Sequence, residues 1–143
     1  MSNVFPQSPQ LSQLDNALVH AYERQGRTLD DLPYTTEFGQ IVTAGRQIQA
    51  SLDELEAFHR LQAIRKAGKL PRIEYEPPVR VHLSENERDL LIHLVTQALG
   101  SLGRRDQLPY SAQAEDLRKQ FSDRTGRDLS QYEFWRAVAR IAK

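Results

Sequence analysis

The chain has 143 residues, 39% of them hydrophobic, and its 19 Lys and Arg are balanced by 19 Asp and Glu. This length suits one domain or two small units, and the neutral charge argues against strong unspecific binding to nucleic-acid phosphates. The absence of cysteine excludes disulfides, thiolate zinc sites and cysteine nucleophiles, and no window of about eighteen apolar residues is available to span a membrane.

Residues 1–10 contain two prolines and several polar amides, which predicts a flexible tail. They lack the basic start and the apolar run of a signal peptide, so we expect a cytoplasmic protein. The next residues, 11–69, are predicted to form a first three-helix unit. Its first helix carries apolar residues at helical spacing from Leu11 to Tyr22 and ends at Gly26, and a polar connection follows over residues 27–32.

The second helix of this unit follows Leu32-Pro33-Tyr34-Thr35, in which Thr35 is a suitable N-terminal cap. Gly39 and Gly45 either weaken this helix or mark close packing. For the third helix we predict a capping box formed by Ser51 and Glu54. We attribute the acidic pair Asp30-Asp31 to a helix start, where backbone amides favour negative charge.

Residues 70–83, between the two predicted units, break the helical pattern. Ile73 and Tyr75 alternate with glutamates, and Val79, Val81 and Leu83 alternate with Arg80 and His82. Alternation predicts an extended chain with one buried side. Pro77-Pro78 would either turn this chain into a short ribbon or stiffen it as a linker, and we favour the linker.

Residues 84–143 are predicted to form a second three-helix unit. Ser84 and Glu87 make a capping box for a helix that ends at Gly103 and carries a wide apolar stripe. A stripe this wide belongs in a core or in an interface with a second copy or a protein partner, through Leu90, Leu91, Leu94 and Leu99.

The last two helices have the clearest signals in the chain. The first follows Leu108-Pro109-Tyr110-Ser111 and ends at Gly126. The second begins with a capping box formed by Ser130 and Glu133, with Phe134 on its apolar face. The sequence therefore predicts a pair of helices joined by a tight corner.

The two Leu-Pro-Tyr-Thr/Ser segments indicate an internal repeat. A shift of 76 residues places Tyr34 on Tyr110, and a shift of 77 places Leu52 on Leu129. Chance matches between leucines of amphipathic helices are the alternative explanation. The predicted fold is all-α, with about six helices in two tandem, similar three-helix units that are joined by an extended Pro-rich segment.

The layout of the last two helices resembles the helix-turn-helix class, because an amphipathic helix ends at a glycine and a capped, partly basic helix follows. An extended segment after a helix ending RKAGK also resembles a winged-helix module. These resemblances imply that the last helix reads nucleic acid, with Tyr132, Arg136 and Arg140 pointing outward. The implied binding residues are Arg118, Lys119, Arg127, Tyr132, Arg136, Arg140 and Lys143.

No residue set indicates catalysis, and we expect neither an enzyme nor a cofactor. The four histidines never lie three or four positions apart, so no helix offers a metal-binding pair. Two functions remain open: a nucleic-acid-binding protein, with DNA as the expected ligand and RNA as the other candidate, and a non-enzymatic helical protein–protein interaction or adaptor module. The basic C-terminal helix favours nucleic acid, whereas the balanced charge favours the interaction module.

Overall fold

The computed structural model describes residues 11–74 and 80–142. Within them it contains six α-helices, two short 3-10 helices and no strand. In chain order these are α1 Gln13–Gln25, η1 Leu29–Asp31, α2 Thr36–Arg46, α3 Glu54–Lys66, α4 Glu85–Leu99, η2 Leu102–Gln107, α5 Ala112–Thr125 and α6 Gln131–Ile141. The predicted all-α class and number of helices are confirmed. The predicted tail, the Pro77-Pro78 turn and Lys143 lie outside the described residues.

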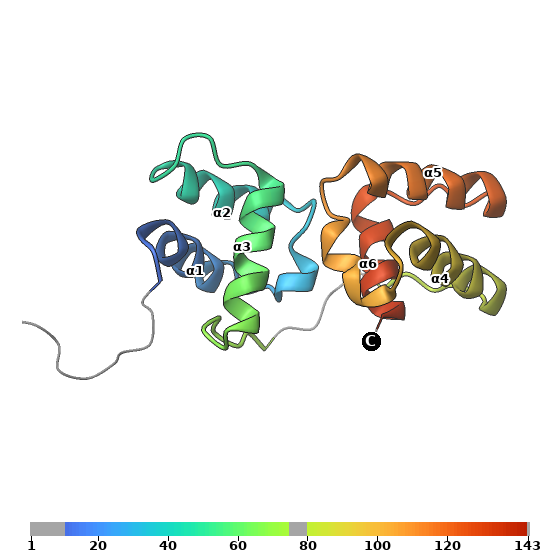
Figure 1. The fold of residues 1–143 in the computed structure, drawn as a ribbon, viewed down its shortest axis with the longest axis horizontal. Helices are drawn as coiled ribbons and strands as arrows, with labels where there is room; N and C mark the ends of the chain where they lie inside the picture. The colour runs from blue at the N-terminus through green and yellow to red at the C-terminus, as the bar shows by residue number, and fades with distance from the viewer. Residues whose placement is uncertain (1–10, 75–79, 143) are drawn as a thin grey trace, which may run out of the picture.

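The helices form two groups that lie side by side along the long axis of the molecule (Figure 1). In the first group α1 packs against α2 and α3, and in the second α4 packs against α5 and α6. Each group has the same order of elements, a helix followed by a 3-10 helix and two further helices. This common order supports the internal repeat that the sequence predicts.

Most helix ends lie where local sequence signals place them. Two of the three predicted capping boxes, at Ser84 and Ser130, are present, and Gly26 and Gly126 adopt the left-handed conformation that ends α1 and α5. Two ends differ from the prediction. Asp53, and not Ser51, accepts the capping hydrogen bond of α3. α4 ends at Gly100, and the residues up to Gly103 begin η2.

The connection predicted to be polar, residues 27–32, is largely buried between the two units, over residues 29–32. Leu29, Asp31 and Leu32 are at most 2% exposed, because η1 packs against α6 of the other unit. In return, η2 of the second unit packs against α3 of the first. The contacts are therefore reciprocal: the 3-10 helix of each unit packs against the last helix of the other, as in the symmetric interface of a homodimer.

Tyr34 and Tyr110 lie in this contact between the two units. The backbone N–H of Tyr34 donates to the hydroxyl oxygen of Tyr110, and the N–H of Tyr110 donates to that of Tyr34 at 2.7 Å. Their ring centroids are 4.5 Å apart. Both residues have a positive φ, 68° and 66°, which is costly for a bulky side chain. The reciprocal hydrogen bonds stabilise this conformation, because they satisfy both amides at once.

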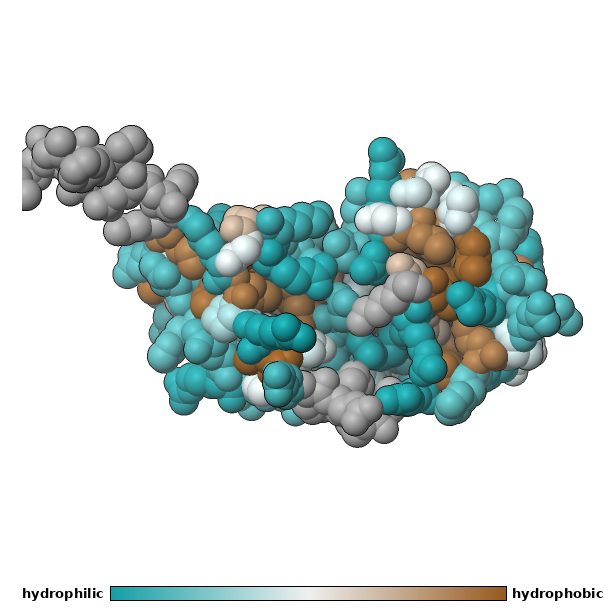
Figure 2. All heavy atoms as spheres, turned by 90° about the horizontal axis from the view of Figure 1, so that it is seen from below, coloured by the Kyte–Doolittle hydropathy of each residue, from teal (hydrophilic) through white to brown (hydrophobic). Residues whose placement is uncertain are grey.

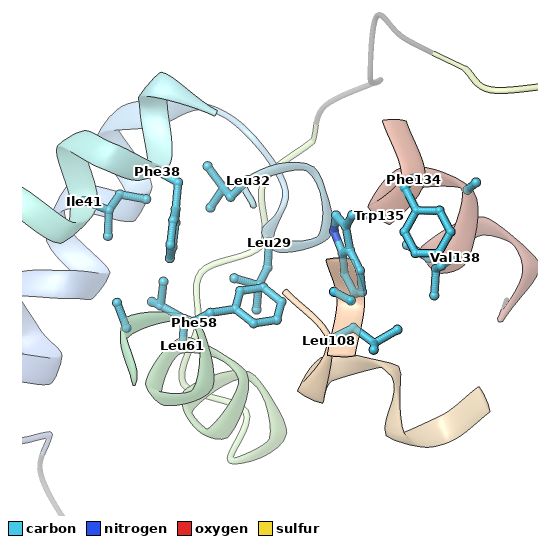
Figure 3. Close-up of a cluster of buried hydrophobic side chains, with 14 of the residues drawn as sticks. Leu29, Leu32, Phe38, Ile41, Phe58, Leu61, Leu108, Phe134, Trp135 and Val138 are labelled. Carbon is cyan, nitrogen blue, oxygen red and sulfur yellow. The ribbon is translucent and has the colours of Figure 1, made fainter. Parts of the chain in front are cut away.

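A continuous hydrophobic core joins the units. Figure 3 shows Trp135 of α6 next to Phe58 of α3, and the two rings meet edge to face with centroids 5.9 Å apart. The indole nitrogen of Trp135 donates to the carbonyl oxygen of Asp30 at 2.8 Å, so its one polar group is satisfied in the buried site.

Candidate interaction site

The helix-turn-helix resemblance assigns the reading of nucleic acid to Tyr132, Arg136 and Arg140 of α6. Tyr132 and Arg136 face η1 of the first unit. The Tyr132 hydroxyl donates to a carboxylate oxygen of Asp31, and Arg136 donates to the carbonyl oxygen of Asp30 at 2.9 Å. The prediction that both point outward is wrong, because the second unit uses this face of α6 to contact the first.

Asp31 explains why two polar side chains are held there. Its carboxylate is fully buried and needs compensating partners. Arg27 donates to it at 2.8 Å, and the Nε atom of Arg136 lies 3.6 Å from it. Burial, together with the hydrogen bond to the Asp31 carboxylate and its negative charge, raises the pKa of Tyr132 to about 12. The phenol therefore stays protonated and can donate to the carboxylate.

Arg118 and Arg127 also have internal partners. Arg118 pairs with Glu115 and donates to the carbonyl oxygen of Leu129 at 2.9 Å, which ties α5 to the start of α6. Hydrogen bonding from Arg118 accordingly lowers the pKa of Glu115. Arg127 donates to the carbonyl oxygen of His82 at 2.6 Å and lies 3.3 Å from Glu87. These contacts hold the extended segment before α4 against the second unit.

Lys119 and Arg140 are the two members of the predicted set that are exposed within the described residues. They lie on different helices, α5 and α6. Most of α6 is covered, since its buried residues are Phe134, Trp135, Ala137, Val138, Ala139 and Ile141. A recognition helix needs an open face to enter the major groove. The structure therefore does not bring the predicted residues together on one reading surface.

The leucine stripe of α4 is also largely internal. Leu91, Leu94 and Leu99 are buried in the core of the second unit, while Leu90 is partly buried against the same core. Three of the four leucines expected to face a partner are thus unavailable. The stripe is wide because α4 packs against both α5 and α6.

A cleft that the sequence did not single out lies where the extended segment meets α6. We call it the α6 cleft. It is open to solvent, with a volume of about 320 Å³, and is lined by Val81, His82, Leu83, Arg88, Ala137, Arg140 and Ile141. Val81 and Ile141 are each only 8% exposed, so they form part of an apolar floor, and the exposed side chains of His82, Arg88 and Arg140 surround it.

The charge of the α6 cleft is one-sided. Among the described residues no acidic side chain lines it, and neither Arg88 nor Arg140 forms an ion pair or a side-chain hydrogen bond with any of them. A larger cleft of about 450 Å³ lies beside η1 and contains Arg65, Arg72 and Arg136. There Arg65 lies 3.6 Å from a carboxylate oxygen of Asp30, and Arg136 is bound to η1. Uncompensated positive charge above apolar surface is therefore clearest in the α6 cleft.

Apolar surface is visible on both units when the molecule is seen from below the view of Figure 1. Figure 2 shows two such areas, one on each unit, with hydrophilic surface between them. The local signal for the cleft was present in the alternation of Val81 and Leu83 with Arg80 and His82. The neighbouring Ala137, Arg140 and Ile141 could not be connected to it without the fold.

Two other kinds of site are absent from the part of the chain that the structure describes. No three His, Asp or Glu side chains there are grouped to hold a metal ion. None of the helices in residues 11–74 and 80–142 combines the length and the apolar character needed to cross a membrane. Comparisons with protein-family models, curated proteins and solved structures gave no match to this chain.

Proposed function

We propose that the chain is a non-enzymatic protein-interaction module that binds an acidic, partly apolar segment of a partner protein in the α6 cleft. The observation that carries this proposal is the pair Arg88 and Arg140, which flank an apolar floor without an acidic partner among the described residues. An incoming carboxylate could pair with a guanidinium through two parallel hydrogen bonds. Apolar side chains of the same segment would displace water from Val81 and Ile141.

A rigid frame around the cleft supports this function. Arg127 holds the backbone of His82, and the capping box of Ser84 and Glu87 fixes the start of α4 directly after it. On the other side α6 is fixed by its contacts with both units. A cleft that is already formed loses little conformational freedom on binding, which favours affinity.

Nucleic-acid binding is the competing hypothesis and remains a prediction from sequence. Arg140 and Lys119 could contact phosphates, but the other charged members of the set within the described residues are committed to internal contacts. The apolar floor of the α6 cleft also has no counterpart in a phosphate backbone. These features favour a peptide over DNA or RNA. The cytoplasmic location likewise remains a prediction.

The experiment measures fluorescence anisotropy of labelled probes at low and physiological salt. The probes are a short peptide of alternating glutamate and leucine, the same peptide with lysine in place of glutamate, a DNA duplex and a single-stranded RNA. We expect the acidic peptide alone to bind. The double variant Arg88→Ala/Arg140→Ala should weaken it about tenfold or more, because charged hydrogen bonds contribute about 1.5–3 kcal/mol each before solvent screening.

Arg124→Ala is the matched control, since Arg124 is an exposed arginine on α5 outside the cleft. It should leave peptide binding unchanged. Failure of the acidic peptide to bind the wild type, or equal binding by the double variant, would contradict the proposal. Binding of DNA or RNA that depends on Arg140 and falls steeply with salt would instead support the nucleic-acid hypothesis.

A further inference from the structure

At one pair of equivalent positions the two units carry side chains of very different size, and a cavity lies beside the smaller one. Thr35 caps α2 and accepts a hydrogen bond from the N–H of Phe38 at 3.1 Å. Ser111 caps α5 and accepts one from the N–H of Ala114, also at 3.1 Å. Phe38 and Ala114 therefore occupy the same position in their units, three residues after the cap. The first unit has a phenyl ring there and the second has a methyl group.

In the first unit the ring at this position packs against the tyrosine of the other unit. The side chain of Phe38 is fully buried and stacks on Tyr110, which reaches in from the second unit, with centroids 5.6 Å apart and planes inclined by 19°. Tyr34 reaches in the opposite direction, into the second unit, and together with Ala114 it lines a small cavity. Since Tyr34 and Ala114 are equivalent to Tyr110 and Phe38, this cavity lies where a ring at position 114 would stack on Tyr34.

The cavity is apolar inside and polar at its rim. Its apolar lining residues include four drawn in Figure 3, which are Leu108, Phe134, Trp135 and Val138. Glu115, Arg118 and Gln131 also line it, and they are the more exposed members. The empty space is about 270 Å³ with its mouth included, while the enclosed part holds about one water molecule. A ring can enter only if a rim side chain moves.

Arg118 is a long, partly exposed side chain at this rim. It is 22% exposed, and one of its carboxylate partners, Asp128, is 90% exposed and 3.6 Å away. Its other contacts are with Glu115 and with the carbonyl oxygen of Leu129. Long charged side chains readily exchange such partners for water at a surface. Displacement of the Arg118 side chain would therefore widen the mouth while leaving the backbone of α5 in place.

We propose that this cavity is a binding site for an uncharged aromatic ring of phenyl size. The ring stacks on Tyr34 as Phe38 stacks on Tyr110, and it packs against Trp135 and Val138 at the bottom of the cavity. The site is separate from the α6 cleft, which involves Ala137, Arg140 and Ile141 of the same helix. It therefore extends beyond the proposed binding of an acidic segment and can be tested without it.

Trp135 provides the readout, because it lines the cavity and is the single tryptophan of the chain. Toluene is the first probe, since it matches the side chain of phenylalanine, and N-acetylphenylalanine amide is the second. We expect toluene to cause a saturable change in Trp135 fluorescence below its solubility limit. A response to the amide as well would assign the site to a protein side chain, whereas a response to toluene alone would assign it to a free small molecule.

Two variants make the test specific. Arg118→Ala opens the mouth and should tighten toluene binding at least about threefold. If Arg118 only supported the structure of the site, its removal would weaken binding instead. Ala114→Phe places the ring within the chain itself, so it should abolish the response and raise the melting temperature. If Ala114→Phe does not fold, Ala114→Met fills the same space with a more adaptable side chain.

The proposal is overturned if neither the wild type nor Arg118→Ala gives a saturable response of Trp135. It is also overturned if the folded Ala114 variant responds as the wild type does, since toluene would then bind elsewhere. A chemical-shift map for the wild type adds an independent criterion. The largest changes should fall on Tyr34, Ala114 and the indole N–H of Trp135, and changes confined to other residues would contradict the site.

Discussion

Arg136 and Arg140 lie one turn apart on α6, yet their surroundings differ completely. The Arg136 side chain is 14% exposed and is held by the carbonyl oxygen of Asp30 and the carboxylate of Asp31. Arg140 is exposed at the rim of the α6 cleft and has no partner within the described residues. Arg136 therefore contributes to joining the two units, whereas Arg140 is available to a ligand.

This contrast gives a prediction about stability. Arg136→Ala should lower the free energy of unfolding by about 1–3 kcal/mol, because it leaves the buried Asp31 with fewer partners. Arg140→Ala should change it by no more than about 0.5 kcal/mol, as is usual for an exposed position. Guanidinium unfolding followed by circular dichroism measures both. Equal effects of the two substitutions would mean that the contact with η1 contributes nothing to stability.

The role of Arg136 could not be predicted from sequence, because its partners are far away in the chain. Helical periodicity placed Tyr132 and Arg136 opposite Phe134 and Val138, and that local statement is right. It does not follow that the opposite side faces solvent. The equivalent positions of α3, taken with the same offset that pairs Phe58 with Trp135, are occupied by Leu55 and His59. The repeat therefore gave no sign of the Asp31 contacts either.

Individual elements were predictable where their signals are local. The capping boxes of α4 and α6 depend on residues three positions apart and formed as expected. The end of α4 was placed too late because Gly100 and Gly103 are both suitable terminators, and η2 begins between them. The two glycines of α2 illustrate a different limit, since the sequence left open whether they weaken the helix or allow close packing.

The structure separates these two glycines. A Cβ atom at Gly39 would meet nothing within 4 Å, so Gly39→Ala should raise the melting temperature, with a gain of about 0.5–1 kcal/mol from helix propensity. A Cβ atom at Gly45 would lie 2.4 Å from Leu52 and 2.9 Å from Leu18, whose side chains are buried. Gly45→Ala should therefore lower the melting temperature, with an overpacking cost of about 1–3 kcal/mol. Thermal unfolding of the two variants should show shifts of opposite sign, and two increases would show that Leu18 and Leu52 can shift away from α2 without cost.

At the scale of the whole molecule, the repeated Leu-Pro-Tyr segments indicated two similar units, and the common order of elements agrees with this, but they did not indicate how those units pack. Their tyrosines meet across the contact, and the same contact covers much of the last helix. A helix-turn-helix layout read from one unit assumes that this helix stays open. Pairing of two such units removes that condition, which explains why the layout was a poor guide to the exposed surface.

This packing predicts that the two units unfold together. Phe58 is fully buried in the first unit and contacts both Phe38 and Trp135 edge to face. Phe58→Ala should cost about 3–5 kcal/mol, the usual range for a buried phenylalanine. If the units are coupled, the loss should shift the fluorescence transition of Trp135 in the second unit and the circular dichroism transition of all helices by the same amount. A second unit whose Trp135 transition keeps its midpoint in this variant would show that the shared core does not make the two units one folding entity.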